Sequence, residues 1–230
     1  MSCVLPRSQE TDLRLDDIAA RLRAHEWVQD VRPIASTTIP DQIGCSSAVK
    51  VFVVPSAAGV RALRRRGKTY LVAAWERHLR RPGAAIEVRI DWRLTEALPT
   101  TGHPVALVEP GPQWLPIISD LALDADSRRL TCRLFVPYDL PIFSGHFPSA
   151  PIVPGVIQVG WAVELAHLHG LVAGDFTGIS AAKFRRLVQP GMILAARLER
   201  GPQTEQLQFW YETVDTVVSS GRLKFGAAHG

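Results

Sequence analysis

The sequence predicts an α+β protein in two parts, a small α/β unit followed by one apolar helix with an antiparallel sheet. The 230 residues are 47% hydrophobic and 21% charged, which suits one or two globular domains. The segment 99–114 holds four prolines and two glycines, which end regular elements, so we expect domains at 1–105 and 106–230. After this boundary, strand-like alternation surrounds a single helical pattern.

The first domain reads as two helices and two strands. Residues 15–24 have apolar side chains at helical spacing and aspartates in the first turn, where negative charge suits the helix dipole. Residues 49–55 form a short β-branched run that ends at a proline, which is typical of a strand. A helix is expected over 56–79, with Ser56 as its N-cap, and the alternation of 86–92 predicts a half-buried strand.

The second domain is predicted to place a buried helix among strands. Residues 156–170 form the helix, opened by Pro154-Gly155 and closed by Gly170. Its side chains are apolar nearly all round, so it should be buried on most sides. The strands are expected at 117–123, 130–136, 177–187, 192–198, 207–214 and 217–225.

Cysteine usage and hydropathy exclude several classes of protein. Cys3, Cys45 and Cys132 are far apart and odd in number, which argues against a disulfide framework or a metal site and favours a reducing cytoplasm. No run reaches the ~18 apolar residues that a membrane span needs. The N-terminus lacks the basic and apolar pattern of a secretory signal. We therefore expect a cytoplasmic protein without a membrane span.

The net charge of +4 favours an acidic partner, either nucleic acid or an acidic carrier protein. The densest basic run is 61–68, and the simpler interpretation of such a run is a solvated helix face. No zinc-finger spacing, aromatic RNA-binding string or phosphate-binding glycine loop accompanies it, so we do not expect nucleic-acid binding.

The most informative stretch is 143–156, which carries His146 between a glycine and a phenylalanine and leads into the apolar helix. Prolines and glycines fix the backbone path, and a placed imidazole ahead of a helix suits acid–base catalysis. The alternative is a histidine with a surface or capping role.

The string G-H-F-P-x-x-P-I-x-P-G-V resembles the active-site segment of the 3-hydroxyacyl-acyl-carrier-protein dehydratases of the hot-dog fold. The resemblance covers roughly 114–228 and includes 182–191, similar to the family's strand and turn F-R-R-P-V-x-P-G. Gln158 and Trp161 are most similar to the ApeI-like branch found in aryl-polyene clusters. The matching residues are Gly145, His146, Phe147, Pro148, Pro151, Ile152, Pro154, Gly155 and Val156.

This resemblance implies a central helix wrapped by a curved antiparallel sheet, in at least a homodimer. It implies dehydration of a 3-hydroxyacyl thioester on acyl carrier protein to the trans-2-enoyl thioester, with no cofactor beyond the carrier's phosphopantetheine. His146 would be the base, and N–H groups at the helix start would receive the thioester oxygen. Gly155 either allows close approach of the thioester or is a plain helix-start glycine. The implied substrate contacts are Phe147, Gly155, Val156, Gln158 and Gly160.

The chain departs from the family where a catalytic Glu or Asp stands fourteen residues after the histidine, because that position is Gly160 here. Glu164 lies one turn, or ~5.4 Å, further along the helix. It is either the catalytic acid or an edge carboxylate paired with an arginine. Gln158 either orients the substrate hydroxyl or caps a backbone group. His167 and His169 are expected at the negative end of the helix dipole.

Arg185 and Arg186 are expected either to meet the phosphopantetheine phosphate and acidic carrier side chains, or to lie solvated on a strand.

The first domain resembles the C-terminal subdomain of adenylate-forming acyl-CoA synthetases. The resemblance rests on 15–28, 49–55 and 92–103, and His103 stands where that family has a lysine that contacts the acyl-adenylate. The sequence does not contain the large adenylation domain, so we expect no ATP-driven activation. The domain would be a relic or a docking module.

Two rival functions remain open. The glycine at 160 fits a non-catalytic hot-dog subunit that binds acyl chains or carrier protein in a larger complex. A hot-dog thioesterase would instead release free thiol from its substrate.

Overall fold

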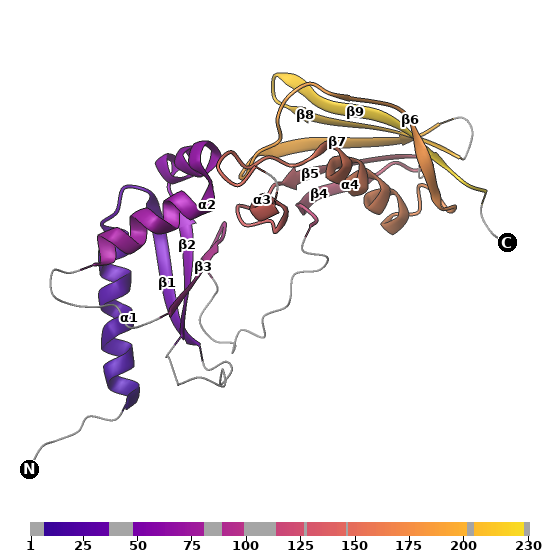
Figure 1. Ribbon diagram of the computed structural model, residues 1–230. Coiled ribbons are helices and arrows are strands. Elements are labelled where there is room, and N and C mark those ends of the chain that lie inside the picture. The colour runs from indigo at the N-terminus through magenta and orange to yellow at the C-terminus, as the bar shows by residue number, and fades with distance from the viewer. Residues whose placement is uncertain are drawn as a thin grey trace, which may run out of the picture. The chain divides into compact units, whose positions relative to one another are not determined.

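The computed structural model describes residues 7–36, 48–80, 89–98, 114–126, 128–145, 147–201 and 205–227. They belong to two compact units (Figure 1). Unit 1 comprises Met1–Val108 with Pro148–Pro151, and unit 2 comprises Glu109–Phe147 with Ile152–Gly230. None of the helices in the described part of the chain is long and apolar enough to cross a membrane.

Unit 1 is a three-stranded sheet with two helices packed against it. The strands lie in the order β1-β2-β3, with β1 and β2 antiparallel and β2 and β3 parallel. Strand β1 was not predicted from the sequence. The elements are α1 (Arg7–Arg23), β1 (Val28–Ser36), β2 (Ala48–Pro55), α2 (Ala57–Leu79) and β3 (Arg89–Leu94).

The predicted N-cap of α2 is confirmed. The hydroxyl of Ser56 accepts the N–H of Gly59 at 3.1 Å and donates to the carbonyl of Glu26 at 2.7 Å, so one side chain caps α2 and fastens it to the residues before β1. The prediction of an unbroken helix is wrong at Gly67, whose φ of 76° and ψ of 170° are not helical. The buried residues of α2 recur every fourth position, at Gly59, Leu63, Gly67, Leu71, Trp75 and Leu79.

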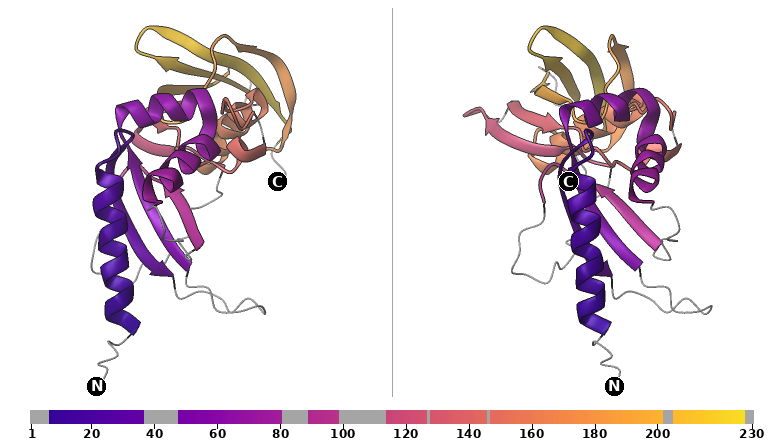
Figure 2. Two further views of the ribbon diagram at one scale, coloured as in Figure 1. Left: turned by 60° about the vertical axis from the view of Figure 1, so that its left-hand side comes forward. Right: turned by 90° about the vertical axis from the view of Figure 1, so that its left-hand side faces the viewer.

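Unit 2 is a six-stranded antiparallel sheet with one long helix, α4 (Gly155–Leu168), against it (Figures 1 and 2). Trp161, Ala162 and Leu165 of α4 are buried in one core with side chains of the strands. The sheet order is β4-β5-β7-β8-β9-β6. The other elements are β4 (Ile117–Leu123), β5 (Arg129–Phe135), α3 (Ile142–Gly145), β6 (Phe176–Phe184), β7 (Ile193–Arg200), β8 (Gln206–Thr213) and β9 (Thr216–Phe225).

This arrangement confirms the predicted fold class, a hot-dog unit preceded by a small α/β part. The strand predictions for unit 2 are confirmed to within a few residues at each end. The predicted close of the helix is also confirmed, because Gly170 adopts a φ of 68° and the N–H of Leu171 donates to the carbonyl of Ala166 at 2.9 Å.

Strand β6 differs from the inner strands of the sheet. It lies at one edge and pairs with β9. None of its residues is buried, since each one is exposed or intermediate in burial. The large apolar side chains of Phe176, Ile179 and Phe184 are among those exposed. A second protein surface could therefore pair with this edge.

Candidate active site

The predicted base, His146, lies outside the described residues. The chain reaches it through α3 and leaves it through Phe147, which has an exposed side chain and a positive φ of 53°. Positive φ is uncommon for a residue other than glycine, so the backbone turns sharply immediately after position 146.

The start of α4 presents unpaired backbone donors. The N–H groups of Ile157 and Gln158 both donate to the carbonyl of Pro154, at 3.1 and 3.2 Å. Within the described part of the chain, the N–H groups of Gly155 and Val156 make no hydrogen bond. The side chain of Val156 is 72% exposed, so this first turn is open at the surface of the protomer. A helix start of this kind favours an oxygen that gains negative charge.

The segment 184–188 borders this helix start at two points. A β-carbon built on Gly155 would lie 2.7 Å from the ring of Phe184, so the glycine allows this ring to approach the helix. The N–H of Val153 donates to the carbonyl of Val188 at 2.7 Å. Arg185 and Arg186 lie between these contacts with exposed side chains. The two arginines predicted to bind the carrier are thus held at the edge of the candidate site.

Gln158 is 2% exposed, and both polar atoms of its side chain form hydrogen bonds inside unit 2. Its Nε2 donates to the carbonyl of Val153 at 3.0 Å, and its Oε1 accepts the hydroxyl of Ser219 at 2.7 Å. The hydroxyl of Tyr211 donates to its backbone carbonyl at 3.1 Å. Burial, with a smaller effect of Cys132, holds the pKa of Tyr211 well above its usual value, so this hydroxyl stays a donor.

Of the two roles predicted for Gln158, the described contacts correspond to the capping of a backbone group. Its amide fixes the carbonyl of Val153 immediately before α4. Both polar atoms of the side chain are buried and hydrogen-bonded within unit 2.

Gly160 lies under an aromatic ring. A β-carbon built at this position would lie 3.1 Å from Cζ3 of Trp114. The indole N–H of Trp161 donates to the carbonyl of Trp114 at 2.7 Å, which holds the backbone of residue 114 beside α4. The indole of Trp114 thus occupies the space beside Gly160 into which a side chain would extend.

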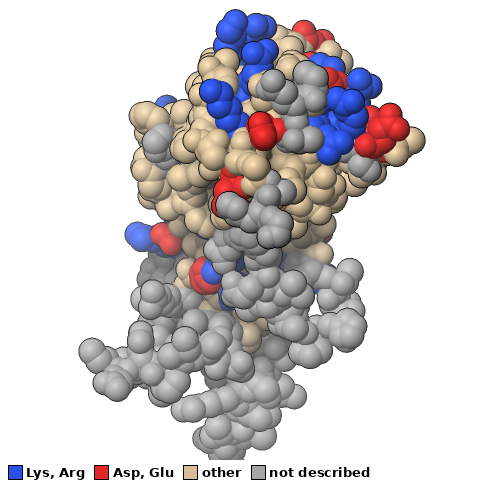
Figure 3. Space-filling model, turned by 90° about the vertical axis from the view of Figure 1, so that its right-hand side faces the viewer, with Lys and Arg blue, Asp and Glu red and all other residues tan. Residues whose placement is uncertain are grey.

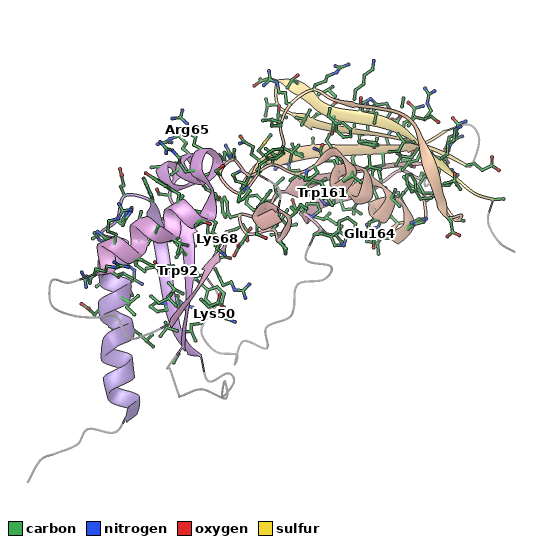
Figure 4. All side chains as sticks on the ribbon, viewed as in Figure 1. Lys50, Arg65, Lys68, Trp92, Trp161 and Glu164 are labelled. Carbon is green, nitrogen blue, oxygen red and sulfur yellow. The ribbon has the colours of Figure 1, made fainter. Side chains whose placement is uncertain are left out.

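Glu164 and Trp161 both belong to α4, and Figure 4 labels them. Trp161 is buried, whereas Glu164 is intermediate in exposure. No ion pair joins Glu164 to another described residue, so the predicted pairing with an arginine is not seen there. The carboxylate of Glu164 is thus partly exposed and is not held by an arginine of the described chain.

His167 and His169 lie at the C-terminal end of α4, as predicted. A ring nitrogen of His167 lies 3.0 Å from the carbonyl oxygen of Gly174, and His169 is the C-cap residue. Both positions suit the negative end of the helix dipole.

Three arginines on the sheet of unit 2 pair with carboxylates. Arg129 and Arg197 both contact Glu199, at 2.8 and 3.2 Å, and Arg133 contacts Asp120 at 3.3 Å. Figure 3 shows basic and acidic side chains next to each other on one face of this unit. This sheet surface is therefore of mixed charge.

Three residues that shape the helix start were missed from the sequence: Trp114, Phe184 and Ser219. Each comes from a segment distant in sequence from 146–164 and reaches α4 through the fold. Phe184 belongs to the segment 182–191 that resembles the family's F-R-R strand, whereas Trp114 and Ser219 gave no signal in spacing or composition.

Residues 122–222 match the protein family described as ApeI-like, ApeI dehydratase. The chain resembles these dehydratases. A 3-hydroxyacyl-[acyl-carrier-protein] dehydratase FabZ of Chlamydia pneumoniae is 38% identical over 88 residues, covering 34% of this chain and 58% of the relative. The FabZ of Syntrophotalea carbinolica is 44% identical over 72 residues, covering 26% of this chain and 46% of the relative. The chain thus spans about half the length of these relatives.

Among solved structures, the dehydratase heterocomplex ApeI:P from Xenorhabdus doucetiae is 29% identical, with a TM-score of 0.44. The aligned region covers 47% of this chain and 96% of the ApeI:P chain. The ApeI-like match extends over unit 2 and includes the helix start, the two arginines and Glu164.

Proposed function

We propose that unit 2 dehydrates 3-hydroxyacyl thioesters on acyl carrier protein to trans-2-enoyl thioesters, in fatty-acid or aryl-polyene type biosynthesis. The observation that carries the proposal is the open start of α4, with free N–H groups at Gly155 and Val156, inside the segment that matches ApeI-like dehydratases. Such donors suit a thioester oxygen that gains charge when the proton on C2 is removed.

The reaction removes a proton from C2 and hydroxide from C3, so that a carbon–carbon double bond forms and water leaves. His146 takes the C2 proton and returns it to the leaving oxygen. The N–H groups of Gly155 and Val156 hold the thioester oxygen, and Glu164 assists the departing hydroxyl. Arg185 and Arg186 bind the phosphate of phosphopantetheine.

Mass spectrometry of the full chain with a 3-hydroxyacyl carrier-protein thioester tests the proposal. Wild type should remove one water from the substrate, and His146→Ala should not. His169→Ala provides a matched histidine control outside the site. Release of free carrier thiol would instead identify a thioesterase, and full activity of His146→Ala would refute the assignment of the base.

A second function is favoured by the contact between Gly160 and Trp114, which removes the acid of the related enzymes from its usual turn. In this alternative, the chain is a non-catalytic subunit that binds acyl chains or carrier protein in a larger complex. Carrier binding by wild type without water loss, for any substrate tested, would favour it.

The assembly, the first domain and the compartment are part of the same proposal. Strand β6 lies at a sheet edge with exposed apolar side chains, which supports a homodimer formed through this edge. Light scattering of wild type and of Ile179→Lys tests the dimer. Unit 1 is a synthetase-tail domain without adenylation activity, and the protein is cytoplasmic.

A further inference from the structure

The outward side of α2 in unit 1 concentrates basic side chains. Arg61, Arg65 and Arg66 are exposed, and Arg61 and Arg65 lie on the side of the helix opposite the buried Leu63. Figure 4 shows Arg65 projecting from α2 away from strands β1–β3. No Asp or Glu occurs between residues 57 and 75, so the helix itself supplies no counter-charge to them. We call the surface formed by these arginines and Tyr70 the basic face.

No described carboxylate neutralises the charges of Arg61 and Arg65. Arg61 and Arg65 are four residues apart, one turn along a helix, where like charges repel. Neither forms an ion pair with another described residue. This differs from the sheet of unit 2, where Arg129 and Arg197 share the carboxylate of Glu199. A surface that keeps such repulsion favours a ligand that brings negative charge.

The surroundings of Tyr70 favour a protein as that ligand over single-stranded nucleic acid. Tyr70 is 42% exposed, and the guanidinium of Arg66 lies 5.2 Å from the centre of its ring. The ring is therefore already occupied on one face, whereas single-stranded nucleic acid needs aromatic rings free for base stacking. An exposed tyrosine beside arginines is typical of protein–protein interfaces. Guanidinium groups are well matched to carboxylates.

We propose that the basic face of α2 docks the acidic surface of the acyl carrier protein that delivers the substrate to unit 2. The proposal rests on the proposed function, which requires such a carrier. Docking on unit 1 would tether the carrier to the same chain as the catalytic unit. The tether would raise the effective concentration of the thioester without any contact to the acyl group.

Charge reversal in the full chain tests the proposal. The variant R61E/R65E is compared with R222E/K224E, which reverses two exposed charges on β9 of unit 2 and serves as the matched control. Carrier-protein affinity is measured by fluorescence anisotropy at low and high salt. Dehydration rates are measured with a carrier-bound 3-hydroxyacyl substrate and with its carrier-free N-acetylcysteamine thioester.

We expect R61E/R65E to weaken carrier binding and to raise KM for the carrier-bound substrate by about tenfold at low salt, with kcat unchanged. Added salt should reduce this difference. The carrier-free thioester should react at the wild-type rate in both variants. R222E/K224E should resemble wild type in every measurement.

Wild-type carrier affinity in R61E/R65E would overturn the docking proposal and leave the proposed dehydratase untouched. The same would follow if single-stranded RNA bound through these arginines while carrier protein did not. If neither substrate lost water with wild type, the proposed function would fail. The loss of carrier affinity in R61E/R65E would then still support the docking surface.

Discussion

The indole ring of Trp114 fills the space into which a side chain on Gly160 would extend. A β-carbon at position 160 would lie 3.1 Å from Cζ3 and 3.5 Å from Cη2 of that ring. Because Trp161 holds the carbonyl of residue 114 at 2.7 Å, the ring and the glycine belong to one packed layer on α4. The glycine is explained by this packing, and not only by the loss of an acidic side chain.

Gly160→Glu should therefore destabilise unit 2 by about 1–3 kcal/mol, because the new side chain must displace the indole. Urea unfolding measures this. The double variant Trp114→Ala/Gly160→Glu should lose less unfolding free energy than the two single variants lose together. The difference should be at least about 1 kcal/mol. Leu168→Glu, at an exposed position of the same helix, is the control and should change stability by less than about 0.5 kcal/mol. Additive losses would contradict the packing argument.

Gln158→Leu should cost about 2–4 kcal/mol of unfolding free energy, because it leaves the carbonyl of Val153 and the hydroxyl of Ser219 buried without partners. Adding Ser219→Ala removes one of these orphaned groups, so the double variant should be no less stable than Gln158→Leu. Denaturant titrations of the three proteins check this. A Gln158→Leu protein as stable as wild type would show that water replaces the amide.

Unit 1 should lose stability in mild acid through His25. Burial, and then the nearby His78, lower the pKa of His25 below its ordinary 6.5, while Glu26 opposes the shift. Its Nδ1 accepts the N–H of Trp27 at 3.1 Å, and this acceptor is lost on protonation. The unfolded chain thus takes up the proton more readily. The contribution to stability is complete above pH 6.5 and is lost as the pH falls through 6.5 toward the lowered pKa.

Urea midpoints of unit 1, followed by tryptophan fluorescence above and below this pH, measure the effect. His25→Asn keeps an acceptor near the position of Nδ1 but cannot titrate, so it should flatten the pH dependence. His169→Asn in unit 2 is the control and should leave it unchanged. An undiminished pH dependence in His25→Asn would assign it to another group.

Glu164→Gln should lower kcat for dehydration by about 10²-fold, because the departing hydroxyl loses the carboxylate that assists it. The amide is isosteric, and Glu164 has no ion pair with a described residue, so stability should change little. Glu212→Gln, a carboxylate on β8, is the matched control. Single-turnover rates with carrier-bound substrate separate chemistry from carrier binding. Wild-type turnover in Glu164→Gln would remove this residue from the mechanism.

Much of the fold was predictable because local patterns agree with it. The inner strands β5, β7 and β8 of unit 2 alternate between buried and more exposed side chains. Helix α4 is bounded by Pro154 and Gly170, whose backbone preferences start and stop helices. Strand β1 was missed because Asp30, Arg32 and Pro33 interrupt the apolar alternation. Its pairing with β2, rather than its own residues, makes it a strand.

The candidate site was predictable only along one stretch of sequence. Motif residues such as Gly155 lie where the pattern placed them, at the start of α4. The roles of Gln158 and Gly160 depend on Ser219 and Trp114, which pack against them from elsewhere in the fold. Such contacts are tertiary, and no local pattern specifies them.

The break at Gly67 sets the directions of the two halves of α2. Positions four residues apart advance by about 400° around a straight helix, so a row with this spacing drifts by about 40° at each step. From Gly59 to Leu79 the drift would carry the last side chains to the opposite side, yet Leu79 is buried like Leu63. The non-helical Gly67 therefore turns the second half of α2 so that its buried side chains face the core again. Gly67→Ala should destabilise unit 1, because alanine disfavours a φ of 76° and its β-carbon would meet the carbonyl oxygen of Pro148.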